Sequence, residues 1–234
     1  MASAAAGTDE FAQFMRDSRA ADTRMVSRVA DALALVEQFL GRAGHGAWPG
    51  LDRRAVGSRL RELLVNPRLF QQGLLNLCGP ATFLCMWTGR DPVGFARFAI
   101  TLFEEGSAAI GSLTIAPSTA LLQQDYPALR ARMQSDPCPQ ADWMTMGAIR
   151  NNDDALFVWT GEPGQGLPGL TLPEELTRWL QATGIYAQVS NEANWATLAG
   201  WPHASNLLLF GGQDVALLLN TTAFGRGTAR ALRN

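Results

Sequence analysis

The chain has 234 residues, of which 47% are hydrophobic and 17% charged, and its formal net charge is −2. This length allows one large domain, or a core with a small extension, and a full hydrophobic core without disulfide support. The balanced charge, with no strongly basic stretch, argues against a nucleic-acid-binding surface. Since no apolar run approaches the ~18 residues of a membrane span, we expect neither a nucleic-acid partner nor a membrane span.

The beginning of the chain predicts helices with little chemistry. Apolar residues recur at helical spacing over residues 25–40, behind Thr23 as the helix cap. A shorter helix is predicted over residues 59–65, where Asn and Pro follow it. We therefore divide the chain into an N-terminal helical extension over residues 1–67 and a main domain over residues 68–234.

The most informative stretch is residues 71–89, in which a loop turns into an apolar helix at Cys78. Gly79 permits a sharp turn, and Pro80 suits the first helical turn because the N–H that it lacks would have no partner there. The free N–H groups of a helix N-terminus favour a thiolate over a thiol. The pattern therefore predicts a nucleophilic Cys78, with a buried structural cysteine as the alternative.

The rest of the chain predicts a mixture of helices and short strands. A β-like run covers residues 110–115, and a strand is predicted over residues 185–189. Between them, the capping-box pattern of residues 171–174 predicts the start of a helix that ends at Gly184. Cys138 lies between two prolines, which predicts a loop with an exposed thiol.

Gln72 and Gly73 stand ahead of Cys78 in the pattern Gln-Gly-x-x-x-x-Cys. This pattern resembles the papain-like cysteine hydrolases, in which a glutamine at that spacing donates to the oxyanion and the cysteine opens the central helix. The residues Leu-Cys-Gly-Pro-Ala differ from the cathepsin-type Cys-Gly-Ser-Cys-Trp signature. They are more similar to divergent bacterial peptidases and secreted bacterial toxins. The resemblance covers residues 71–89.

The resemblance implies an α+β, helix-rich papain-like domain with a central Cys-bearing helix and a small antiparallel sheet. It also implies Cys78 as the nucleophile and Gln72 as the oxyanion donor. In this family a histidine and then an Asn or Asp follow the cysteine, about 130–150 residues downstream. His203 and Asn220 follow in this order and near this distance, as base and orienter, and Asp214 is a weaker substitute for Asn220.

One feature departs from the family pattern. His203 follows Trp201 and Pro202, so it can begin a helix as well as lie on a strand. If it begins a helix, too few residues remain after Asn220 for the histidine-bearing hairpin of this fold. The alternative is then a catalytically inactive interaction module or a truncated pseudoenzyme, which keeps the papain-like helix and binds a protein partner through residues 23–40.

We expect no metal and no cofactor. The chain has no Cys-x-x-Cys or His-x-x-x-His pattern for zinc, no Walker loop and no Gly-x-Gly-x-x-Gly. Three cysteines without a visible signal peptide indicate synthesis in the cytoplasm. The resemblance implies a bacterial effector or toxin, exported by a specialised secretion system into a target cell. Its partners would be a protein or peptide substrate and an immunity protein or chaperone.

Overall fold

A computed structural model describes residues 3–133, 136–153, 159–165, 171–191 and 213–216. The elements in these ranges are α1 (Ser3–Leu40), α2 (Arg53–Val65), the 3-10 helix η1 (Pro67–Leu69), α3 (Cys78–Arg90), α4 (Pro92–Glu105), β1 (Ala108–Ile110), β2 (Leu113–Ile115), α5 (Thr119–Leu122), α6 (Tyr126–Met133), α7 (Gln140–Asn152) and α8 (Pro173–Thr183). All of them belong to the first of two compact units, Met1–Val189 and Ser190–Asn234.

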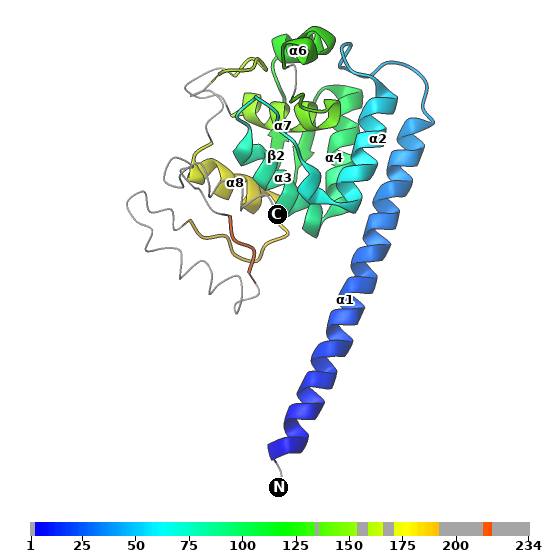
Figure 1. Cartoon of the computed structure of the whole chain (residues 1–234), viewed down its shortest axis with the longest axis vertical. Helices are drawn as coiled ribbons and strands as arrows, with labels where there is room; N and C mark the ends of the chain where they lie inside the picture. Colours follow the sequence, from blue (N-terminus) through cyan, green and yellow to red (C-terminus); the bar gives the residue numbers. More distant parts are fainter. Residues whose placement is uncertain (1–2, 134–135, 154–158, 166–170, 192–212, 217–234) are drawn as a thin grey trace. The chain divides into compact units, whose positions relative to one another are not determined.

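Helices dominate the first unit, and its sheet within the described residues is one antiparallel hairpin, β1 with β2 (Figure 1). Ala108 pairs with Ile115, and Gly111 turns the hairpin with a φ of 54°. The predicted helix-rich α+β class with a small antiparallel sheet is therefore confirmed. The strand predicted over residues 185–189 is wrong, because its apolar side chains pack on the core from an irregular chain path.

Two helices, α4 and α7, form the centre of this unit. The helix α4 contacts α1, α2, α3, α7 and β1, because apolar residues occupy most of its surface. Every residue of α7 from Ala141 to Asn151 is buried, since α2, α3, α4 and β2 pack around it. The cysteine-bearing helix α3 packs against α4, α7 and α8, and its N-terminus reaches the molecular surface.

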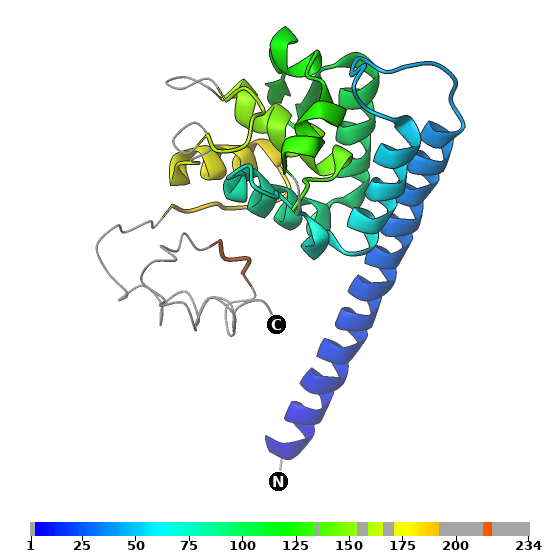
Figure 2. The same cartoon turned by 45° about the horizontal axis from the view of Figure 1, so that its top comes forward.

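The helix α1 belongs partly to this core. Its last turns pack against α2 and α4 through Ala32, Val36 and Phe39, and two views show the three helices side by side (Figures 1 and 2). Between residues 16 and 30 most side chains are exposed, and Val26 is 69% exposed. The Thr23 hydroxyl donates to the carbonyl of Arg19 inside the helix, so it is not the predicted cap. The predicted boundary at residue 67 falls inside this compact unit.

The helix α8 begins one residue later than its sequence pattern predicts. Leu172 is the N-cap residue, and its N–H donates to Oε2 of Glu175 at 2.7 Å. Pro173 explains the shift, because proline is favoured at the first helical position and this placement makes Glu175 the third. Thr171, the predicted cap, lies outside the helix and is buried. Gly184 ends the helix in the left-handed conformation, as predicted.

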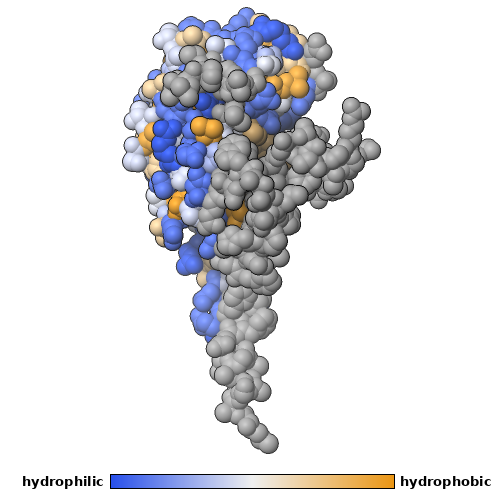
Figure 3. Space-filling model, turned by 90° about the vertical axis from the view of Figure 1, so that its left-hand side faces the viewer, coloured by the Kyte–Doolittle hydropathy of each residue, from blue (hydrophilic) through white to orange (hydrophobic). Residues whose placement is uncertain are grey.

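Exposed apolar side chains are scattered over this unit. The face shown in Figure 3 carries small separate apolar patches on a largely hydrophilic surface. The large exposed hydrophobic residues among those described are Val26, Val65, Leu69, Leu74 and Leu172. Within the same ranges, no helix combines the length and the apolar character needed to cross a bilayer.

Candidate active site at the start of α3

Cys78 is the first residue of α3, and its side chain is exposed. The residues before it alternate between core and solvent: Leu75 and Leu77 are buried, whereas Asn76 is exposed like Cys78. Asn76 adopts a left-handed φ of 55°, which turns the loop into the helix. The thiol is therefore presented to solvent beside the free N–H groups of a helix N-terminus, and a buried structural role for it is excluded.

The other two cysteines have different environments, and all three are free thiols. Cys85 is partly buried, and this burial raises the pKa of its thiol. Cys138 is completely buried, which raises the pKa of its thiol well above the ordinary value. The predicted exposure of Cys138 is wrong, because its Sγ turns inward and donates to the carbonyl of Gln71 at 3.1 Å. Cys78 is thus the accessible thiol.

Gln72, the predicted oxyanion donor, is partly buried on the segment that leads to Cys78. The Oε1 atom of its amide is buried and accepts no hydrogen bond. The Nε2 atom makes no hydrogen bond within the described residues either. Because an oxyanion donor must be free to donate, this orientation of the amide suits the predicted role.

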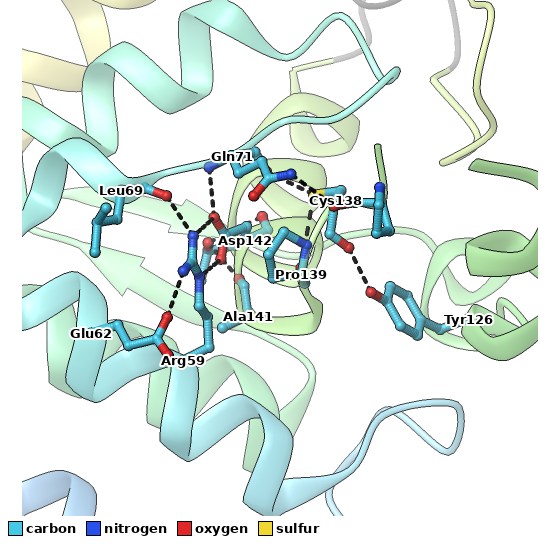
Figure 4. A network of polar contacts seen from close by, with 11 residues as sticks. Arg59, Glu62, Leu69, Gln71, Tyr126, Cys138, Pro139, Ala141 and Asp142 are labelled. Carbon is cyan, nitrogen blue, oxygen red and sulfur yellow. Dashed lines mark hydrogen bonds and ion pairs between the residues drawn. The ribbon is translucent and has the colours of Figure 1, made fainter. Parts of the chain in front are cut away.

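The backbone just before Gln72 is fixed by a buried ion pair (Figure 4). Asp142 on α7 is fully buried and accepts two hydrogen bonds from Arg59 on α2, at 2.8 and 3.1 Å. It also accepts the backbone N–H of Gln71 at 2.7 Å. Burial disfavours the charge of Arg59, but the hydrogen bonds and charge of Asp142 outweigh it and hold the pKa of Arg59 above its ordinary value. At Asp142 burial outweighs the same contacts and raises the pKa of the carboxyl.

A second set of contacts holds the same segment to the chain around Cys138. The Nε2 atom of Gln71 donates to Oδ1 of Asp136 at 2.9 Å and to the carbonyl of Pro137 at 3.2 Å. Gly73 has a φ of 56°, and a Cβ atom there would lie 2.5 Å from the carbonyl oxygen of Asp136. Only glycine allows the backbone at position 73 to lie this close to the Asp136 carbonyl. We call the contacts of Gln71 and Gly73 with residues 136–142 the clamp.

The start of α3 is also in close contact with the residues that precede α8. A Cβ atom at Gly79 would collide with the side chain of Thr171, so this glycine is needed for close packing. The sharp turn predicted at Gly79 is wrong, because Gly79 lies inside α3 without a left-handed φ and Asn76 makes the turn. Thr171 is 7% exposed, and its Oγ1 atom is buried without a hydrogen-bond partner in the described ranges. The approach of Thr171 therefore fixes α8 beside the end of α3 that carries Cys78.

Of the predicted catalytic residues, Cys78 and Gln72 lie on one continuous described segment. His203 and Asn220 lie outside the described residues, and Asp214 lies in the second unit. Sequence reasoning missed the residues of the clamp. Asp142 was a usable signal for them, because it is a charged residue in the apolar helix of residues 140–152. A fully buried Asp is almost always paired with a cation.

Comparison with protein-family models, curated proteins and solved structures finds no match for this chain. In the ranges that the structure describes, no group of three or more His, Cys, Asp or Glu residues is arranged to hold a metal ion.

Proposed function

We propose that the protein is a papain-like cysteine hydrolase acting on amide bonds of proteins or peptides, as a peptidase, amidase or deamidase. The observation that supports this most is the exposed thiol of Cys78 at the first residue of α3. The clamp holds the backbone just ahead of it, and Gln72 lies on the same segment with its amide nitrogen free of hydrogen bonds within the described residues. These are the parts that a nucleophile and an oxyanion site require.

The proposed reaction has two steps. The Sγ thiolate of Cys78 attacks the carbonyl carbon of the amide, and the oxyanion accepts hydrogen bonds from Gln72 Nε2 and the Cys78 N–H. The C–N bond then breaks, the amine leaves with a proton from the protonated His203, and a thioester remains. Water attacks the thioester, His203 takes a proton, and the carboxylic acid leaves as the thiolate is restored. With a glutamine side chain as substrate, the same steps release ammonia.

In this proposal Asn220 orients the imidazole of His203. A bacterial effector or toxin with this activity would act on a protein or peptide in a target cell and would be restrained by an immunity protein or chaperone in the producing cell. This assignment follows from the resemblance of residues 71–89 to the divergent bacterial branch of the family.

The test is the rate of iodoacetamide labelling at each cysteine, read by peptide mass. We expect Cys78 to react at pH 7 at least about tenfold faster than free cysteine, because only the thiolate reacts, and to slow in a His203→Ala variant. Cys138 should stay unlabelled in the folded protein, since it is buried. A folded protein in which Cys78 reacts no faster than free cysteine would contradict the proposal.

A second candidate function is a protein-binding module, and the uncovered first part of α1 favours it. Val26 is 69% exposed, whereas the later apolar residues of the same helix are used inside the fold. A Val26→Ser change should then reduce partner binding or cellular effect, while Cys78→Ala should leave both unchanged. For a hydrolase the two variants should have the opposite effects, so the pair decides between the candidates.

A further inference from the structure

A cavity separate from the Cys78 site lies where the end of α1 meets the start of α2. It has a volume of about 520 Å³, which is in the range of small-molecule sites. Its lining includes the apolar Leu51 and Phe103, the imidazole of His45 and the guanidinium groups of Arg42, Arg53 and Arg54. The lining therefore combines apolar walls with several cationic side chains.

The charges that line this cavity are mostly positive. Arg42, Arg53 and Arg54 contribute three guanidinium groups, and Asp52 contributes the only carboxylate of the lining. An oxygen of Asp52 already accepts the N–H of Ala55 as the N-cap of α2. Glu104 pairs with Arg42 and Arg53 from outside the lining, so the three arginines exceed the two carboxylates by one positive charge.

Two of the arginines are held in place from behind the cavity wall. Arg53 donates to both carboxylate oxygens of Glu104, at 2.5 and 3.0 Å, and Arg42 donates to the same carboxylate at 3.3 Å. The Arg53 side chain is 10% exposed and lies over the rings of Phe39 and Phe103. Glu104 does not line the cavity, so its carboxylate fixes these guanidinium groups without occupying the space in front of them.

Arg54 differs because it is exposed and makes no hydrogen bond or ion pair within the described residues. It follows Arg53 in the first turn of α2, where the helix N-terminus adds partial positive charge. His45, on the loop between α1 and α2, also lines the cavity. A planar guanidinium group without a partner can bind a carboxylate or phosphate through two parallel hydrogen bonds.

We propose that this cavity binds a small organic anion, with its phosphate or carboxylate group on Arg54 and Arg42 and its apolar body against Phe103 and Leu51. Glu104 holds the guanidinium groups of Arg42 and Arg53 in a fixed geometry, which limits the entropy lost when the anion binds. The apolar walls favour an anion that carries a hydrocarbon or aromatic group over a free inorganic ion. This site is independent of the reaction at Cys78.

The test uses His45 as a spectroscopic reporter, since the chain has only two histidines. The imidazole C2–H signal, assigned with His45→Gln, is followed while phenyl phosphate, benzoate, inorganic phosphate or phenol is added at constant pH and ionic strength. We expect saturable shifts with phenyl phosphate or benzoate, about tenfold tighter than with inorganic phosphate because the ring is buried. Phenol should give no saturable shift, because it lacks the anionic group.

The variant Arg54→Gln should weaken the binding of phenyl phosphate about tenfold, because it removes a charge-assisted hydrogen-bond donor. Arg97→Gln is the matched control: it removes the same charge from an exposed position of α4 that does not line the cavity. Equal weakening by both variants, or binding that Arg54→Gln leaves unchanged, would overturn the proposal. So would the absence of a saturable His45 shift with every anion. The relative affinities of phenyl phosphate and benzoate distinguish the preferred head group.

Discussion

Two regions of this protein each contain an ion pair between a carboxylate and an arginine, and the two ion pairs have different roles. Beside the Cys78 segment, the fully buried Asp142 accepts two hydrogen bonds from Arg59 and a third from the backbone N–H of Gln71. At the cavity, Glu104 accepts two from Arg53, but its side chain is 21% exposed. Both acceptors are carboxylates on core helices, so the difference lies in burial and in the third partner.

The difference shows what each ion pair can determine. Asp142 contacts the main chain, so it fixes the path of the segment before Gln72 and thereby the approach to Cys78. Glu104 contacts side chains, so it fixes the positions of guanidinium groups on a cavity wall while the backbone is held by other contacts. Burial also changes the energetics, because an ion left without its partner inside a protein costs much more than one that water can reach.

The largest effect is expected from Asp142→Ala. This change leaves Arg59 and the Gln71 N–H without their acceptor in a buried place, so the free energy of unfolding should fall by about 3–5 kcal/mol. Urea unfolding followed by tryptophan fluorescence measures it. Asp142→Asn should cost less, since it keeps an oxygen for Gln71. A loss below about 1 kcal/mol for Asp142→Ala would show that the pair does not hold the clamp.

A smaller effect is expected from Gly73→Ala, the other part of the clamp. The left-handed φ and the approach to the Asp136 carbonyl should together cost about 2 kcal/mol. If the segment positions the site, the labelling rate of Cys78 should also fall in protein that is still folded. Gly89→Ala is the control, because Gly89 lies in α3 with no atom near the added methyl group, and it should be neutral or stabilising.

These residues also show what could be predicted from the sequence. The start of α3 at Cys78 and the stop of α8 at Gly184 follow from local chemistry, because glycine and proline act on their own backbone. Gln72 instead rests on the resemblance of residues 71–89 to papain-like hydrolases, and its catalytic role stays a prediction. Local signals could not reveal the pairing of Asp142 with Arg59, since the two are far apart in the chain and only the packing of α2 on α7 joins them.

Two errors have the same origin. Cys138 between prolines has the local pattern of an exposed loop, yet contacts with the distant Gln71 turn its thiol inward. The apolar run at residues 185–189 has a strand-like composition, yet a strand requires a neighbouring strand to pair with, and these residues pack irregularly on the core instead. In both places tertiary contacts outweigh local preference.

At the cavity, Glu104→Gln should cost about 1–2 kcal/mol near pH 7, because Arg53 keeps one acceptor but loses the charge. The hydrogen bond from Arg53 holds the pKa of Glu104 below its ordinary value, although burial acts against this. The stability that this carboxylate contributes is therefore present above about pH 4.3 and is lost as the pH falls through the lowered folded-state pKa. Urea unfolding of both proteins between pH 3 and 7 measures the difference.

The outcome at low pH decides whether Glu104 acts through its charge. We expect the wild type and Glu104→Gln to converge in stability as the pH falls through the lowered pKa of Glu104, since the wild-type carboxylate is then protonated. A difference that stays constant down to pH 3 would show that Glu104 contributes through packing alone. Phosphate binding at the cavity should weaken in this variant too, because Arg42 and Arg53 lose the carboxylate that positions them.

The smallest effect is expected at the exposed pair of Glu37 and Arg61. Arg61 donates to both carboxylate oxygens of Glu37, as Arg53 does to Glu104. However, the Arg61 side chain is 43% exposed and the Glu37 side chain is 58% exposed. Glu37→Gln should therefore cost at most about 0.5 kcal/mol, because water solvates both ions when they separate. Salt should reduce even this cost, since the pair is open to screening.

This exposed pair gives the reference against which the other two are measured. A double-mutant cycle with Glu37→Gln and Arg61→Gln isolates the interaction from the separate effects of each change. If its coupling energy equals that of the cycle with Glu104→Gln and Arg53→Gln, then burial does not set the strength of these contacts. The special role of the clamp would then rest on the backbone N–H of Gln71 alone. The opposite result is a coupling energy that rises from Glu37 with Arg61, through Glu104 with Arg53, to Asp142 with Arg59. Burial would then also set the strength of these contacts.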